Sequence, residues 1–240
     1  MEIQQIIIGI VIVLLIYLLY LWLFGDNTHV YLSGIHKASD PLVIDRSKFP
    51  NNKKSSDYTY SIWLYINNWD TSKRKDIFYR KSNKASKASK PAIHVSLGQF
   101  LNNVNVSLGL KSKSPKSQIC TLENIPLQTW ANVTITINNR SLDLYLNGKL
   151  VRTCILTAVP VMPSGYLHVC TAVNDNTNGN GFDGYISNFQ YLARAINPRE
   201  AYAIYKEGPG GSSWITNLIN KYRIKIAFMN NNREVNSFEI

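Results

Sequence analysis

Residues 129–153, TWANVTITINNRSLDLYLNGKLVRT, alternate apolar and polar side chains over three short runs separated by two turn signals. This period of two predicts strands with one buried face. The pair Asn147-Gly148 is typical of a type I′ turn, which joins antiparallel neighbours. The segment therefore predicts a three-stranded meander, and its expected core positions are Val133, Ile135, Ile137, Leu142, Leu144 and Leu146.

The same alternation recurs along the chain between turns rich in Asn, Gly and Pro. It predicts strands at 58–66, 77–80, 92–98, 105–110, 165–170 and 184–192. One helix signal follows, in which Asn197 can cap, Pro198 suits the first turn and Glu200 lies three residues after the cap. We expect that helix from about Pro198 to Lys206. Many short strands with one closing helix predict an all-β, two-sheet antiparallel sandwich.

An uncharged apolar run extends from Ile6 to Phe24. As a helix, these residues would span about 28 Å, which is close to the roughly 30 Å core of a bilayer. The run predicts a transmembrane helix rather than a cleaved signal peptide, because no basic region precedes it and no small-residue cleavage site follows. The positions that mark the span are Ile6, Leu14, Leu15, Tyr17, Tyr20, Trp22 and Phe24.

The expected organisation has five parts. A short tail (1–5) precedes the span (6–24), and a connector (25–57) with one short strand at 42–44 follows it. The sandwich is expected over 58–208, and a C-terminal extension over 209–240. In that extension, apolar residues recur at helical spacing and then alternate.

Basic residues outnumber acidic ones by 26 to 15, which gives a net charge of +11 and favours anionic partners. Many gather in 72–90, which is expected to be mostly loop. The run is either a solvated surface or a contact to an acidic partner. No aromatic stacking surface interleaves these lysines, so nucleic-acid binding is not favoured. The candidate contact residues are Lys73, Arg74, Lys75, Arg80, Lys81, Lys84, Lys87 and Lys90.

Two features bear on the compartment. The three cysteines, Cys120, Cys154 and Cys170, allow at most one disulfide, and we expect three reduced thiols, which suit the cytosolic side. Three Asn-x-Ser/Thr triplets would instead permit glycosylation on the opposite side. They begin at Asn105, Asn132 and Asn139. We expect the domain on the cytosolic side, and the cell surface is the alternative.

Trp130 before its strand, the hairpin LDLYLNGKLV, and GFDGYISNFQYLARAINPREAYAIYKEG about forty residues later resemble the laminin-G-like, concanavalin A-like jelly roll. In that family, a Trp opens one strand, a Y-x-N/D-G hairpin follows, and G-x-I-x-x-F leads to a closing helix. The resemblance covers residues 55–208 and is specific in its second half. It implies a two-sheet jelly roll, a fold shared by lectins, adhesion modules, glucanases and structural appendages.

Glucanases of this family carry two carboxylates on an E-x-D-x-x-E strand, which this sequence lacks. Its glutamates are scattered at Glu2, Glu123, Glu200, Glu207, Glu234 and Glu239. No catalytic residue can be nominated, and we expect no enzyme.

The remaining site candidates are a cation and a sugar. Calcium-binding relatives use oxygen ligands in edge loops, and Asp175 and Asp183 in 173–184 are the candidates here, with ordinary turns as the alternative. A metal-free sugar site needs exposed aromatic rings. Trp63, Trp69 and Tyr145 are candidates, with core packing as the alternative.

The chain resembles membrane-anchored minor capsid proteins of large icosahedral DNA viruses. The resemblance rests on its apolar span, its basic sandwich, its C-terminal extension and its composition, which is rich in Asn, Lys and Ile. The first hypothesis is therefore a structural protein that ties an inner membrane to a capsid shell, with the lipid bilayer and other capsid proteins as partners. The alternative is a membrane-anchored lectin-like or adhesion module that binds a glycan.

Overall fold

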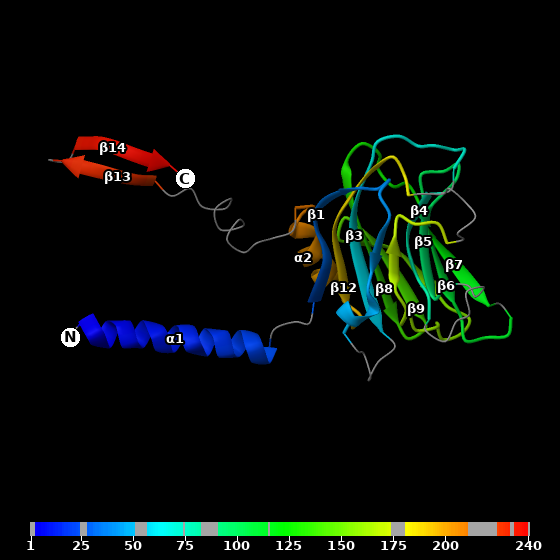
Figure 1. Cartoon of the computed structure of the whole chain (residues 1–240), viewed down its shortest axis with the longest axis horizontal. Coiled ribbons are helices and arrows are strands. Elements are labelled where there is room, and N and C mark those ends of the chain that lie inside the picture. The colour runs from blue at the N-terminus through cyan, green and yellow to red at the C-terminus, as the bar shows by residue number, and fades with distance from the viewer. Residues whose placement is uncertain are drawn as a thin grey trace.

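The computed structural model describes residues 3–24, 28–50, 57–73, 75–82, 91–114, 116–173, 181–210, 225–230 and 233–239. Its main body is a sandwich of two six-stranded antiparallel sheets, which Figure 1 shows face to face. This architecture confirms the predicted all-β, two-sheet sandwich with a short closing helix.

Sheet A has the strand order β1-β12-β3-β8-β9-β10, and sheet B has the order β2-β11-β4-β5-β6-β7. In sheet A the strands are β1 (Thr28–Lys37), β3 (Tyr58–Ile66), β8 (Trp130–Asn138), β9 (Ser141–Leu146), β10 (Lys149–Ile155) and β12 (Gly184–Leu192). In sheet B they are β2 (Leu42–Ile44), β4 (Lys75–Arg80), β5 (Ile93–Leu97), β6 (Val104–Gly109), β7 (Ser117–Leu122) and β11 (Leu167–Val169).

The predicted meander is β8, β9 and β10. Ile135 pairs with Leu144 and Ile137 with Leu142, and all four side chains are fully buried between the sheets. Burying each such side chain stabilises the fold by roughly 1.5–3 kcal/mol. The alternation therefore places the predicted apolar face in the core.

The turn between β9 and β10 has the predicted conformation, because Asn147 and Gly148 both have positive φ, at 50° and 74°. Gly148 has a second role. A Cβ atom at this position would lie 2.8 Å from the Cα of Tyr202, so glycine lets the closing helix approach the hairpin.

The closing helix α2 (Pro198–Lys206) has the predicted bounds. Asn197 and Glu200 form a capping box at its start, in which each side chain accepts a hydrogen bond from the other residue's backbone N–H. The helix packs on the outer face of sheet A, where Tyr205 stacks on Trp63 with ring centroids 5.5 Å apart. An apolar cluster under the helix consists of Tyr145, Leu192, Ile196, Ala201 and Ile204.

On β8 the polar face of the meander is buried, rather than exposed to solvent as its composition suggests, whereas β10 is mostly exposed. Asn132 and Thr134 are fully buried, and both hydrogen-bond the hydroxyl of Ser61 on β3, at 3.0 and 2.9 Å. Since buried polar groups are costly unless they are paired, these bonds let the outer face of the sheet be covered.

Strand β1 (Thr28–Lys37) lies within the predicted connector 25–57 and pairs with β12 as an edge of sheet A. The prediction for this segment is therefore incomplete, although its short strand at Leu42–Ile44 is present as β2. The β1–β12 register shifts between Val30 and Leu32 and again between Leu32 and Ile35. These irregularities break the period of two that sequence reasoning looks for.

The N-terminal segment forms helix α1 (Ile3–Phe24), which lies outside the sandwich (Figure 1). Side chains 9–19 are exposed, including Leu14, Leu15 and Tyr17. Within the part of the chain that the structure describes, no helix has the length and apolar character needed for a membrane crossing. The helix is confirmed, and the transmembrane span is not.

In the C-terminal extension, the alternating part forms a hairpin of β13 (Lys225–Asn230) and β14 (Arg233–Glu239). The helical spacing predicted before it falls within 211–224, which lies outside the described residues.

The expectation of three reduced thiols is wrong. Cys120 on β7 and Cys154 on β10 form a disulfide between edge strands of the two sheets, with Cα atoms 6.2 Å apart. The side chain of Gln118 adds to this junction, donating to the backbone oxygen of Ile155 at 3.1 Å. Cys170 is a free, buried cysteine, and burial raises the pKa of its thiol to about 12.

The disulfide closes a loop of 34 residues, so its loss is expected to lower the free energy of unfolding by up to about 4 kcal/mol. Chemical denaturation of Cys154→Ser without reductant measures this loss. Reductant should lower the wild-type midpoint and leave that of the variant unchanged. Titration of three free thiols in the oxidised wild-type protein would contradict the assignment.

Candidate functional site

The candidate contact residues of the basic run lie in different environments. Lys75 and Arg80 are buried, at 2% and 3% exposure, because 75–80 forms strand β4 rather than a loop. Lys73 is exposed and Lys81 is half-buried. The other candidates, Arg74, Lys84, Lys87 and Lys90, lie outside the described residues.

Lys75 acts inside the fold. Its ammonium group donates to the backbone oxygens of Asp70 and Gln99, and it lies 4.8 Å from the centroid of the Trp69 ring. Burial lowers the pKa of Lys75, since removal from water disfavours the charged form. The residue ties two neighbouring loops together, and its prediction as a contact for an external partner is wrong.

Arg80 is also internal. Its Nε donates to the backbone oxygen of Gly165 at 2.8 Å, and its guanidinium lies 3.5 Å from the centroid of the Phe49 ring. Such a stacked, hydrogen-bonded guanidinium supports the packing of two connecting segments. Arg80 is therefore not available to an anionic partner.

The aromatic residues nominated for a sugar site pack inside the molecule. Trp63 and Tyr145 are 4% and 1% exposed beneath α2. Trp69 is partly buried against the core, and its indole N–H donates to the backbone oxygen of Gln99 at 3.1 Å. Core packing, the alternative role, is confirmed for Trp63 and Tyr145.

A different set of rings lines a pocket on the outer face of sheet A. Tyr185 of β12, Tyr65 of β3 and Trp130 of β8 are direct cross-strand neighbours, and we name these three residues the aromatic row. The Tyr65 ring centroid lies 5.5 Å from that of Trp130 and 6.3 Å from that of Tyr185. All three side chains are half-buried. They form one continuous apolar surface across three strands.

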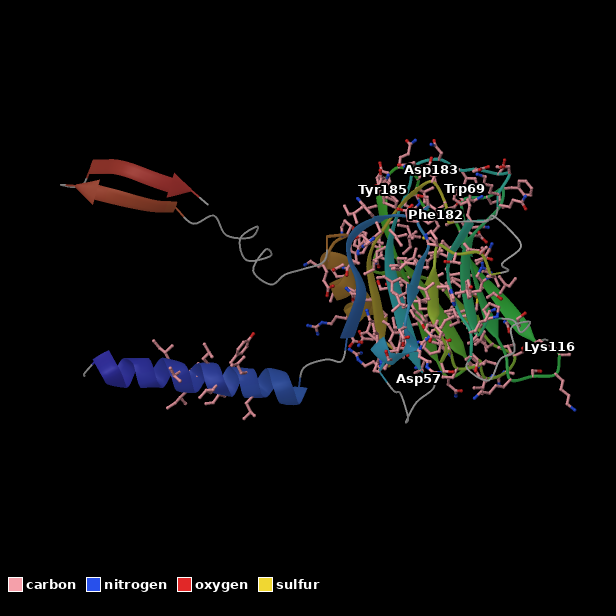
Figure 2. The ribbon with its side chains drawn as sticks, viewed as in Figure 1. Asp57, Trp69, Lys116, Phe182, Asp183 and Tyr185 are labelled. Carbon is pink, nitrogen blue, oxygen red and sulfur yellow. A yellow bond between two sulfur atoms is a disulfide. The ribbon has the colours of Figure 1, made fainter. Side chains whose placement is uncertain are left out.

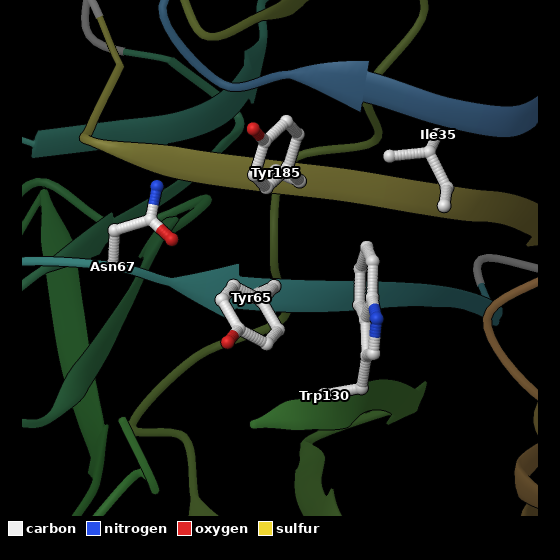
Figure 3. A pocket seen from close by; sticks show the side chains of 5 residues that line it. All are labelled: Ile35, Tyr65, Asn67, Trp130 and Tyr185. Atoms are coloured by element: carbon white, nitrogen blue, oxygen red, sulfur yellow. The ribbon is translucent and has the colours of Figure 1, made fainter. Parts of the chain in front are cut away.

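The pocket over this surface has a volume of about 440 Å³, and Ile35 and Asn67 complete its lining. Figure 3 shows Ile35 and the Asn67 amide on opposite sides of the row. Ile35 is 61% exposed although it is apolar. Pockets that combine an apolar floor with a few polar groups are typical of small-ligand sites.

Asn67, the polar residue of the pocket lining, is bonded to Asp183, which lies next to the pocket. The side-chain amides of Asn67 and Asn68 donate to its two carboxylate oxygens, at 3.1 and 2.7 Å. These bonds favour the ionised form and hold the pKa of Asp183 below its ordinary value. We name Asn67, Asn68 and Asp183 the Asp183 cluster, and Figure 2 places Asp183 at the same end of the sandwich as Tyr185.

Calcium binding at Asp175 and Asp183 stays a prediction. Asp175 falls within 174–180, outside the described residues. Among the described residues, no group of three or more His, Cys, Asp or Glu side chains could hold a metal ion.

This arrangement suits a ligand that has an apolar face and a polar edge. Aromatic rings bind through broad apolar contact with a defined geometry. A pyranose ring offers a matching face of C–H groups, while its hydroxyl groups need donors and acceptors such as those of the Asp183 cluster. The site therefore has the chemistry to bind a saccharide by stacking and hydrogen bonding.

The aromatic row was not predicted from the sequence, although the alternation along β3 already placed Tyr65 on the outward face. Trp63 and Tyr65 share the outward face of β3, but α2 covers Trp63 and leaves Tyr65 accessible. Register places Trp130 and Tyr185 beside Tyr65, and neither residue is near it in sequence.

A profile of the concanavalin A-like lectin/glucanases superfamily matches residues 26–201, which is most of the chain. This chain belongs to the concanavalin A-like lectin/glucanases superfamily. The match begins before β1 and so includes the strand that the predicted resemblance over 55–208 left out. A search of curated proteins gives no match to this chain.

Solved structures with the same fold include receptor-binding domains of botulinum neurotoxins. The serotype D ligand-binding domain in complex with N-acetylneuraminic acid aligns with a TM-score of 0.55 at 16% identity, over 76% of this chain and 44% of that one. The binding domain of neurotoxin DC in complex with rat synaptotagmin II aligns with a TM-score of 0.53 at 14% identity, over 76% and 47%.

A structure of neurotoxin type C, whose cell entry depends on interaction with two ganglioside molecules, aligns with a TM-score of 0.53 at 16% identity, over 76% of this chain and 47% of that one. This chain thus spans less than half the length of each of these three structures. At these identities the similarity shows a shared fold, and it does not locate their ligand sites on this chain.

The pKa of Asp183 gives a pH-dependent prediction. Because the folded-state pKa lies below the ordinary 3.8, the Asp183 cluster is stabilised above that pH and loses this contribution as pH falls through the lowered pKa. An NMR titration of the side-chain carboxyl should give a midpoint below 3.8. Replacing Asn67 and Asn68 with Ala should return it toward 3.8, and a wild-type midpoint at or above 3.8 would contradict the geometry.

Proposed function

We propose that this chain is a non-enzymatic, lectin-like module that binds an oligosaccharide on the aromatic row. The observation that supports this proposal most strongly is that Tyr185, Tyr65 and Trp130 are cross-strand neighbours. All three line an open pocket on the outer face of sheet A. A row that crosses strands offers successive rings to successive sugar units. It therefore suits a chain of sugars better than a single one.

The polar end of the pocket supports the same proposal. Ionised Asp183 presents acceptor oxygens to sugar hydroxyl groups, and Asn67 contributes an amide beside the row. The fold adds a precedent, since N-acetylneuraminic acid and gangliosides are ligands of the neurotoxins named above. Because the match covers less than half of those structures, the precedent supports glycan binding as a class and leaves the kind of sugar to experiment.

Screening the full chain on an array of neutral and sialylated oligosaccharides, followed by calorimetry on the best ligand, tests this proposal. Trp130→Ala should weaken binding about tenfold or more, because loss of an aromatic anchor costs on the order of 1.4 kcal/mol or more. Asp183→Ala should also weaken it.

The matched control is Tyr202→Ala, which removes a 47% exposed ring on α2 that does not line the pocket. Binding by this variant should equal that of the wild type. An array without any ligand, or a Trp130→Ala variant that binds as tightly as the wild type, would exclude the aromatic row as a sugar site.

A second proposal concerns attachment, and it rests on α1. The side chains of residues 9–19 are exposed on every side of the helix, and the large apolar ones among them are at least 50% exposed. We propose that this surface associates with the apolar region of a lipid bilayer, which would hold the sandwich close to a membrane. The hypothesis of a capsid tether depends on this association, and it stays a hypothesis.

Flotation of the full chain with phosphatidylcholine vesicles tests the attachment. Replacing Leu14 and Leu18 with Arg should release the protein, because a charge is costly in the apolar region of a bilayer, by up to roughly 2.5–3.5 kcal/mol on insertion scales. Replacing the same residues with Ala is the control and should preserve flotation. A wild-type chain that fails to float, or an Arg variant that floats as fully, would contradict the proposal.

A further inference from the structure

The three Asn-x-Ser/Thr triplets differ sharply in what the folded molecule allows. Asn132 is fully buried on the outer face of sheet A and hydrogen-bonds Ser61. A branched oligosaccharide on this side chain would have to lie inside the fold. A folded chain therefore cannot carry a glycan there.

Asn105 is half-buried on the outer face of sheet B, where its side-chain oxygen accepts a hydrogen bond from Thr121 at 2.9 Å. Its neighbours on both sides are strands, because β6 lies between β5 and β7. A glycan at this position would have to emerge from the middle of a sheet.

Asn139 is in a different environment. It lies in the two-residue turn between β8 and β9, its side chain is exposed, and its backbone has a positive φ of 52°, which Asn tolerates better than most residues. The backbone N–H of Asn139 donates to the carboxylate of Asp57 at 2.8 Å, which holds the turn in place. The side chain of Asn139 is exposed to solvent. Ser141, the third residue of the triplet, begins β9.

The disulfide is an independent observation about the compartment. A bond between Cys120 and Cys154 is typical of proteins that fold in an oxidising environment, where N-glycosylation also takes place. We infer that Asn139 is the N-glycosylation site of this chain and that the sandwich faces the lumenal or extracellular side. This orientation corresponds to the cell-surface alternative and not to the cytosolic expectation.

The reaction requires a lipid-linked oligosaccharide diphosphate as co-substrate. The Nδ2 atom of Asn139 forms a bond to the anomeric carbon of the first sugar, and the bond between that carbon and the phosphate oxygen breaks. The lipid diphosphate leaves with the proton from the amide. The side-chain oxygen of Asn139 is unchanged.

A glycan at this position is compatible with the aromatic row. Trp130 begins β8 and the Asn139 turn follows its end, so the two are separated by the length of a nine-residue strand, about 30 Å. Figure 2 places Asp57, which holds the turn, at the opposite end of the sandwich from Tyr185. The modification would leave the pocket accessible, and it does not depend on the proposed sugar-binding function.

The test is expression of the full chain in a eukaryotic cell line and a comparison of its gel mobility before and after peptide-N-glycosidase treatment. On treatment, the apparent mass of the wild-type chain should fall by the mass of one glycan. Ser141→Ala should show no such fall, whereas Ser141→Thr should show it, because Thr keeps the hydroxyl that the triplet needs. Asn105→Gln is the second control and should also show it.

Variants at Ser141 are preferred to Asn139→Gln, because Gln at a positive φ strains the turn and risks misfolding. A wild-type chain whose apparent mass does not fall on treatment would overturn the inference. So would a fall that persists in Ser141→Ala, since the glycan would then be attached elsewhere.

Discussion

The packing of α2 against sheet A determines what the outer face of this molecule can do. Tyr205 stacks on Trp63, and the helix reaches the β9–β10 hairpin because Gly148 has no side chain. The covered region is polar as well as apolar, and Asn132 and Thr134 are satisfied by Ser61 rather than by water. The helix therefore buries the part of the outer face around Trp63 and leaves the aromatic row accessible.

Fewer of the chain's basic residues are available to an anionic partner than its net charge indicates. Lys75 and Arg80 are buried and bind backbone oxygens and aromatic rings of the same chain. Buried cations of this kind stabilise loops only when their donors are satisfied. They organise the ends of the sandwich, whereas the group next to the pocket is an ionised carboxylate, Asp183, which accepts a hydrogen bond from the lining residue Asn67.

The sequence predicts local structure well and tertiary neighbours poorly. Alternation identifies β3 and β8–β10, and the capping box identifies α2, because these signals arise within a few residues. Strand β1 is missed because bulges interrupt its period. The Cys120–Cys154 bond and the aromatic row are missed because sheet order creates them, and burial of Lys75 is missed because composition does not show which basic residues pack inside.

If a saccharide stacks on Tyr185, Tyr65 and Trp130, the indole N–H signals of the tryptophans report it in a heteronuclear NMR titration. Addition of the strongest array ligand to the full chain should shift the Trp130 signal. The signal of Trp63, which is 4% exposed beneath α2, should stay in place. An unchanged Trp130 signal at saturating ligand would contradict stacking on the aromatic row.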